Sequence, residues 1–193
     1  MKLRSFYVVH GTLDCMPSSA DLLGSIRPPV PGLELEFQNP GDMLGSFGPA
    51  AAAAAQSLKT LNEEWGYFRL TGAAAWAISM RRVRRGETAF HWNDDKWEAG
   101  LRTLGGPYCE DVIQHLRNTC QSINLMPVPW FPKKLFATRS TLGPSRLARV
   151  CEQLCGHLAR ATDGMIQVFQ EGFFTADGES LLPHAPQHRL KTK

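Results

Sequence analysis

The sequence has 193 residues and a formal net charge of +3, with 43% hydrophobic and 20% charged residues. This length and composition predict one well-buried globular domain, and they exclude a disordered chain or one with membrane spans. The basic surplus is concentrated in Arg81–Arg85 and in residues 189–193, whereas a nucleic-acid-binding domain usually carries a broader basic face, so nucleic acid is not expected as a partner.

The N-terminal part of the chain predicts two strands with a loop between them. Ser5–His10 is a short apolar run, typical of a buried strand. In residues 33–38 apolar side chains alternate with polar ones, as in a half-exposed strand. The proline-rich segment Met16–Pro31 predicts a surface loop.

Three segments begin with Gly-Pro and continue in a helical pattern. Proline suits the first helical position because its missing N–H has no partner there. The predicted helices are Pro49–Glu64, Pro107–Ile123 and Pro144–Thr162. The apolar stripe of the second helix includes Cys120 and Ile123. Gly164 is expected to end the third helix in the left-handed conformation.

Turn signals predict two hairpins. Arg85-Gly86 lies between residues 73–84 and 88–92 and predicts that these two segments pair, with the arginine run at a solvated hairpin end. Asp177-Gly178 is a stronger hairpin signal. The C-terminal strands are expected at Met165–Phe169, Phe173-Phe174 and Ser180–Leu182.

Hairpins in place of regular β-α-β alternation predict the fold class. We expect an α+β fold, in which an antiparallel or mixed sheet has about three helices packed on one side. Residues 1–182 form a single domain in this interpretation, and residues 183–193 form a disordered basic tail. The proline-rich segment Leu125–Lys134 is expected to wrap the surface.

Five cysteines, an odd number without compact spacing, predict reduced thiols. Cys151, Cys155 and His157 have a C-x3-C-x-H spacing, but both cysteines lie on the apolar stripe of the third helix, which favours buried thiols over a zinc site. No metal and no cofactor are therefore expected. The apolar run Phe6–Val9 is too short for a signal peptide, so the protein is expected in the cytosol, without a membrane partner.

Two stretches contain side chains that suit catalysis. His10 follows a predicted strand, where a catalytic group can lie at a sheet edge. His91 is followed closely by Asp94 and Asp95, a set that suits general acid–base work or one metal ion. Neither stretch forms a known catalytic signature. The alternative interpretation of Asp94-Asp95 is that it caps a following helix, with Glu98 in the first turns.

Tryptophans mixed with acidic residues are typical of a protein-binding surface, where aromatic residues are common anchors. Trp92 and Trp97 bracket Asp94 and Asp95, and Glu63-Glu64 beside Trp65 is a second acidic candidate. The alternative is that the indoles fill the core from the loops. The predicted partner-binding residues are Trp92, Asp94, Asp95, Trp97 and Glu98.

The C-terminal third of the chain carries a family resemblance. A helix is followed by Gly172-Phe173-Phe174-Thr175-Ala176-Asp177-Gly178, in a tryptophan-bearing α+β chain of this size without a catalytic motif. In this outline the chain resembles bacterial immunity proteins, and it is nearest to the family that accompanies toxins of restriction-endonuclease fold in polymorphic-toxin and type VI secretion systems. The resemblance implies a protein that is not an enzyme and that neutralises a cognate secreted toxin, expected to be a nuclease, by protein–protein interaction.

The charge of the chain departs from what one mode of inhibition requires. An inhibitor that imitates DNA is acidic, so a slightly basic chain needs a local acidic patch or must occlude the toxin away from its active site. The alternative function is a small enzyme with His10 or His91 as base and Asp94 or Asp95 as partner. That enzyme requires a concave pocket with a histidine and a carboxylate within hydrogen-bond reach.

Overall fold

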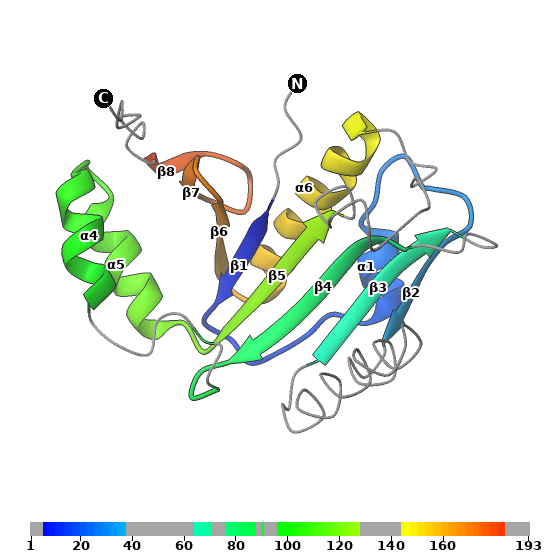
Figure 1. Cartoon of the computed structure of the whole chain (residues 1–193), viewed down its shortest axis with the longest axis horizontal. Helices are drawn as coiled ribbons and strands as arrows, with labels where there is room; N and C mark the ends of the chain where they lie inside the picture. Colours follow the sequence, from blue (N-terminus) through cyan, green and yellow to red (C-terminus); the bar gives the residue numbers. More distant parts are fainter. Residues whose placement is uncertain are drawn as a thin grey trace, which may run out of the picture.

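The computed structural model describes residues 6–37, 64–70, 76–87, 90, 96–127 and 144–183. The described strands form one eight-stranded sheet in the order β2-β3-β4-β5-β1-β6-β7-β8, in which every neighbouring pair is antiparallel (Figure 1). The strands are β1 (Tyr7–Gly11), β2 (Leu33–Phe37), β3 (Glu64–Leu70), β4 (Trp76–Arg84), β5 (Gln121–Pro127), β6 (Gly164–Val168), β7 (Gly172–Phe174) and β8 (Ser180–Pro183). The helices are α1 (Ser19–Gly24), α4 (Lys96–Leu104), α5 (Cys109–Asn118) and α6 (Pro144–Ala161). The predicted α+β class with an antiparallel sheet is confirmed.

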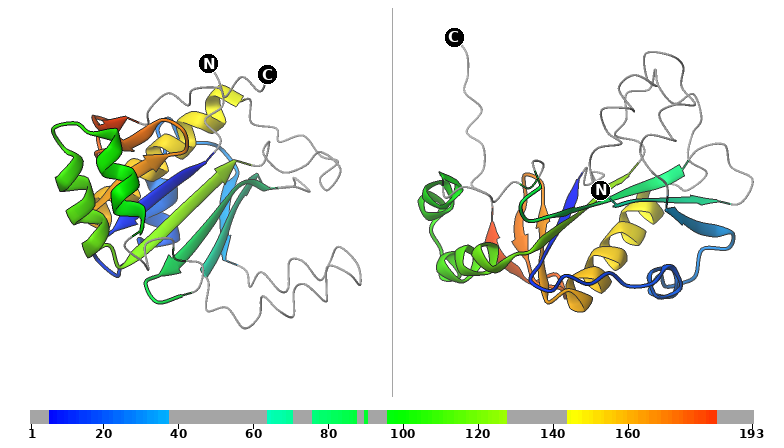
Figure 2. Two further views of the ribbon diagram at one scale, coloured as in Figure 1. Left: turned by 60° about the vertical axis from the view of Figure 1, so that its left-hand side comes forward. Right: turned by 90° about the horizontal axis from the view of Figure 1, so that it is seen from below.

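Helices α6 and α1 cover one face of the sheet (Figure 2). The long apolar side of α6 packs across β1, β5 and β6. Buried side chains from both layers form the main core, including Tyr7 and Val9 of β1 and Leu154 and Leu158 of α6. Because side chains alternate along a strand, Val8 and His10 of β1 face the other side of the sheet.

Helices α4 and α5 pack against that other face, at the β8 end of the sheet. The buried side chains of this second core, which we call the α5 cluster, are Leu101, Cys109, Val112, Ile113, Leu116, Met165, Phe173 and Leu182. Met165 of β6 belongs to it, whereas the next residue, Ile166, belongs to the main core on the other face, which we call the α6 core. Phe173 and Leu182 complete the sheet side of the α5 cluster. The prediction that helices pack on one side of the sheet therefore holds for α1 and α6. The α4–α5 pair forms a second, smaller layer on the other side.

Strand β5 occupies a segment that the sequence assigns partly to a helix. Helix α5 ends at Asn118, because Thr119 has an extended ψ of 124° and the N–H of Cys120 donates to the carbonyl of Gly11 at 2.9 Å. The predicted continuation of the helix to Ile123 is wrong, and so is the predicted surface loop for Leu125 to Pro127. All three residues pair with β4, and Leu125 also pairs with Tyr7 of β1.

The predicted hairpin at Arg85-Gly86 is also wrong, because its first strand, β4, pairs with other segments than the predicted one. Both edges of β4 are occupied, by β3 and by β5, so residues 88–92 are not its neighbour; of these only Phe90 is a described residue. Strand β3 begins at Glu64, which the sequence assigns to the end of a helix. The rest of that predicted helix, residues 49–63, lies outside the described residues, as does the predicted tail after Pro183.

The predicted strands at β1 and β2, the helix α6 and the three C-terminal strands are confirmed. The left-handed residue after α6 is Asp163, with φ of 47°, rather than Gly164. Gly164 instead starts β6 where space is limited, since an added Cβ would lie 2.8 Å from the carbonyl oxygen of His10. The predicted loop Met16–Pro31 contains the short helix α1, which Ser18 and Asp21 cap reciprocally.

Candidate functional site

The helical pair α4–α5 contains Trp97 and Glu98, the two predicted partner-binding residues that the structure describes. Gly105 and Gly106 connect the two helices with φ of 67° and 111°, values that glycine adopts at little cost. The helices contact each other and stand together at one end of the sheet (Figure 1). Their shared apolar side, with Leu101, Val112 and Leu116, faces the sheet, and their outer side faces solvent.

Glu98 ties α4 to α5 through its carboxylate. Arg117 donates to both carboxylate oxygens at 2.7 Å, and Arg102 donates to Oε2 at 3.2 Å. Hydrogen bonds from Arg117 hold the pKa of Glu98 below its usual range, against the effect of burial, and the positive charges of Arg117 and Arg102 act in the same direction. The residue is only 6% exposed, so its carboxylate serves the helical pair and offers little surface to a partner.

The other predicted partner-binding residues fall into two groups. Trp97 is half-buried and packs against the α5 cluster, so its indole contributes to the core from the first turn of α4. Trp92, Asp94 and Asp95 lie outside the described residues. Helix α4 does begin directly after Asp94-Asp95, as the capping interpretation requires.

The outer side of the pair exposes aromatic and acidic side chains at the start of α5. Tyr108 is 47% exposed, and the Glu110 and Asp111 side chains that follow it are also exposed. We call these three residues the α5 patch. In the sequence, Glu110 and Asp111 are only two acidic residues in the first turn of a predicted helix, where they suit the helix dipole. The missed signal is Tyr108, a large aromatic residue that precedes the apolar stripe instead of belonging to it.

His10 does not lie at an exposed sheet edge. It is in β1, between β5 and β6, and is 1% exposed. Its Nδ1 lies 3.2 Å from the Ser122 hydroxyl and its Nε2 lies 2.9 Å from Oε1 of Gln167, while the Phe173 ring lies 6.2 Å away between centroids. This environment is that of a buried histidine with polar partners. His91, like the two aspartates, is outside the described residues.

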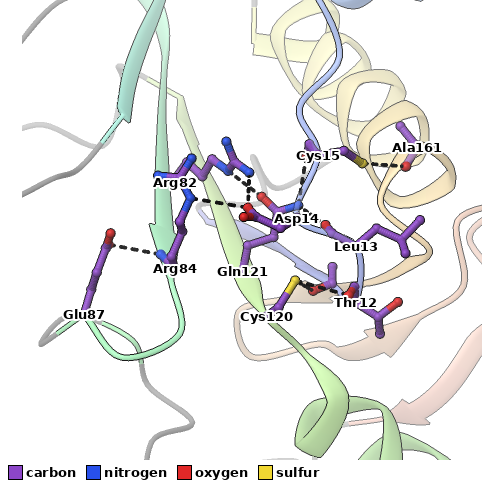
Figure 3. Close-up of polar contacts among 11 residues, drawn as sticks. Thr12, Leu13, Asp14, Cys15, Arg82, Arg84, Glu87, Cys120, Gln121 and Ala161 are labelled. Carbon is purple, nitrogen blue, oxygen red and sulfur yellow. Dashed lines mark hydrogen bonds and ion pairs between the residues drawn. The ribbon is translucent and has the colours of Figure 1, made fainter.

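The arginines of β4 form a polar cluster that sequence reasoning did not find (Figure 3). Arg82 donates to Oδ1 of Asp14 and to Oε1 of Gln121, each at 2.5 Å, and Arg84 donates to the same Asp14 oxygen at 3.3 Å. Arg82 is only 6% exposed, so the prediction of a solvated arginine run is wrong for this residue, whereas Arg85 at the turn is exposed. Arg82 and Arg84 are two positions apart on one strand and therefore share a face.

This arginine cluster fastens the segment after β1 to the sheet. The Gln121 amide donates to the carbonyls of Leu13 and Cys15. On the other side of the segment, the thiol of Cys15 donates to the carbonyl of Ala161 at 3.1 Å, at the end of α6 (Figure 3). The cluster therefore joins β4, β5 and α6 through residues 12–15, and its chemistry is that of a structural clamp.

The thiols and acidic groups of the described chain do not assemble a metal site. All five cysteines are free, and no group of three or more His, Cys, Asp or Glu side chains among the described residues is placed to hold a metal ion. Burial raises the pKa of Cys151 and of Cys155 well above the usual range, so these thiols stay protonated at neutral pH. Within the part of the chain that the structure describes, no helix has the length and apolar character needed to cross a membrane.

Comparisons of the chain with protein-family models, with curated proteins and with solved structures gave no match.

Proposed function

We propose that this protein is an immunity protein, which binds a cognate secreted bacterial toxin and neutralises it by protein–protein contact. The observation that carries the proposal is the α5 patch. It presents an exposed tyrosine beside the exposed carboxylates of Asp111 and of Glu110, the second of which is paired with Arg102 at 3.0 Å. Glu98 and Arg117 hold the helical pair together. Aromatic anchors with neighbouring charge suit a protein partner with a basic surface.

The charge of the patch supports this proposal in a second way. A nuclease binds a polyanion and therefore carries a basic surface. An acidic patch on a chain of net charge +3 can face that surface locally without an acidic protein as a whole. The predicted residues Asp94 and Asp95 come directly before α4 in the sequence. We propose that they add to the acidic surface.

The alternative, a small enzyme, receives less support from the described residues. The His10 imidazole is enclosed in the sheet, and Ser122 and Gln167 are the hydrogen-bond partners described for its ring nitrogens. A general base must reach the proton that it abstracts, and a ring that is 1% exposed lacks that access. The version of this alternative that uses His91 with Asp94 or Asp95 is tested by the same experiment.

The test starts with affinity capture of the partner from the source bacterium and its identification by mass spectrometry. The captured protein is then produced in a bacterial host with and without this chain. We expect the partner alone to arrest growth and the pair to grow. A partner that does not arrest growth, or arrest that persists when both are produced, contradicts the immunity proposal.

Charge reversal locates the surface. We expect Glu110→Lys with Asp111→Lys to weaken toxin binding at least about tenfold, because two attractive charges become repulsive. The matched control is Glu179→Lys, an exposed carboxylate on the loop between β7 and β8, which should leave affinity unchanged. The double change Asp94→Lys with Asp95→Lys tests the sequence-predicted residues separately. If neither pair changes the affinity while both variants melt like the native protein, the toxin binds elsewhere.

A further inference from the structure

Large hydrophobic side chains are exposed at three places in the described chain. They are Leu13, Tyr108 and Phe169, with exposed fractions of 52%, 47% and 49%. Tyr108 belongs to the α5 patch, and Phe169 directly follows β6 and begins the turn into β7. Exposed hydrophobic residues that are scattered singly need no explanation, whereas a group of them marks an interaction site. The place of Phe169 relative to the α5 patch therefore decides what this side chain can do.

Strand β8 links the α4–α5 pair to the turn between β6 and β7. The helical pair reaches β8 just before Tyr108, since a Cβ on Gly106 would lie 3.5 Å from Cδ1 of Leu182. Pro183, which ends β8, pairs with the first residue of β7, and that residue pairs with the last residue of β6. Strands β6 and β8 are two strand spacings apart, about 10 Å. The Tyr108 and Phe169 side chains therefore fit within one interface of about 800 Å² per partner, which is roughly 30 Å across.

Backbone contacts fix the turn that carries Phe169. Its N–H donates to the carbonyl of Phe6 at 3.1 Å, and the N–H of Glu171 donates to the carbonyl of Val168 at 3.0 Å. Gln170, at the centre of the turn, has a φ of 66°. This left-handed conformation is uncommon and unfavourable for most residues other than glycine. The phenyl ring is thus presented from a defined backbone, which lowers the entropy cost of binding a partner.

We propose that Phe169 is a second aromatic anchor of the toxin-binding surface, which extends from the α5 patch across the end of β8 to the turn between β6 and β7. The inference rests on the proposed function, and it adds the chemistry of the toxin's binding face. That face has an apolar pocket for the Phe169 ring and basic side chains opposite Glu110 and Asp111. Aromatic residues are enriched at protein interfaces, where a few side chains carry most of the binding free energy.

The test compares two substitutions that each remove an exposed hydrophobic side chain. Leu13 provides the matched control, because it follows the end of β1 that pairs with the start of β6, whereas Phe169 follows the end of β6. Strand β6 has five residues and is about 17 Å long, so the two side chains lie at opposite ends of it. The probe is the protein captured in the experiment described above, and its affinity for each variant is measured by calorimetry.

We expect Phe169→Ser to weaken binding of the captured protein at least about tenfold, as the loss of an anchor does. Tyr108→Ser should weaken it by a similar factor, because both rings contact the same partner. Leu13→Ser should change the affinity by less than about twofold. All three variants should melt like the native chain, since substitutions of exposed side chains have small effects on stability. If Phe169→Ser melts earlier, Phe169→Leu, which removes the ring and keeps an apolar side chain, takes its place.

The possible failures are distinguishable. Unchanged affinity in a folded Phe169 variant, or an equal loss in Leu13→Ser, overturns this inference. The proposed function then still stands if the captured protein arrests growth and this chain relieves the arrest. A captured protein that does not arrest growth contradicts the proposed function, whereas its selective loss by the Phe169 variant would still support the surface. Failure to capture any partner overturns both.

Discussion

Gly164 begins β6 at a point where β1 leaves no room for a side chain. An added Cβ would lie 2.8 Å from the carbonyl oxygen of His10 and 2.9 Å from Oγ1 of Thr162. The first of these atoms belongs to the backbone of an interior strand. An alanine can therefore fit only if β6 moves away from β1, which disturbs the hydrogen bonds between them.

We expect Gly164→Ala to lower the free energy of unfolding by about 1–3 kcal/mol, the usual cost of overpacking a close contact. Urea denaturation measures this change directly. The matched control is Gly100→Ala in α4, where no atom lies within 4 Å of the added Cβ. Alanine favours a helix by up to about 1 kcal/mol over glycine, so the control should be neutral or stabilising. A similar loss in both variants would show that the close contact is not the cause.

At the scale of elements, α4 and α5 form one unit because the Glu98 carboxylate accepts hydrogen bonds from both helices. Arg102 belongs to α4 and Arg117 to α5. Their hydrogen bonds and charges place the folded-state pKa of Glu98 below its usual value of 4.5. A carboxyl group with a depressed pKa stabilises the fold above its usual pKa, and it loses that contribution as the pH falls through the folded-state value.

We therefore expect Glu98→Gln to be less stable than the native protein at pH 7, with a difference that shrinks as the pH falls below about 4.5. Thermal unfolding followed by circular dichroism between about pH 3 and pH 7 measures this difference. Glu110→Gln is the matched control, since the Glu110 side chain is 70% exposed and pairs with Arg102 at the outer end of the same network. Its effect should be small at every pH. A Glu98→Gln difference that stays constant with pH would contradict the ion-pair explanation.

Local sequence patterns predict a helix or strand correctly when the segments packed against it favour the same conformation. Helix α6 and the strands at β1, β2 and β6 to β8 follow their patterns, because their apolar sides meet the core as the spacing requires. Strand β5 does not, since Cys120 and Ile123 continue the stripe of the preceding helix. Pairing with β4 and β1 decides the conformation of this segment, and no local pattern encodes that pairing.

At the scale of the whole molecule, the candidate site can be predicted from the sequence only where it depends on residues that are close together in the chain. The helix after Asp94-Asp95 is expected from the sequence, but the burial of Glu98 depends on Arg117 from the next helix. The environment of His10 depends on Gln167, which is 157 residues away in the chain. A cavity lined by Tyr7, Cys155 and Phe174 likewise requires β1, α6 and the C-terminal hairpin together. Such groups become visible only after the sheet order is known.

The C-terminal segment contributes buried side chains to both cores. Ile166 and Val168 belong to the α6 core, and Met165, Phe173 and Leu182 belong to the α5 cluster. Each such side chain contributes roughly 1.5–3 kcal/mol when fully buried. Together they match the whole stability of a typical domain, about 5–15 kcal/mol. Removal of β6 would also leave one edge of β1 without its hydrogen-bonded neighbour.

We expect a chain that ends at Asp163 to lose cooperative unfolding, because it keeps neither core complete. Circular dichroism melting and the dispersion of amide NMR signals measure this loss. The matched control deletes residues 184–193 only, which removes no residue of the eight strands, and it should melt like the full chain. If the shorter chain also melts cooperatively, β1 to β5 and α6 fold by themselves, and the C-terminal hairpin is then an addition to the domain instead of part of its core.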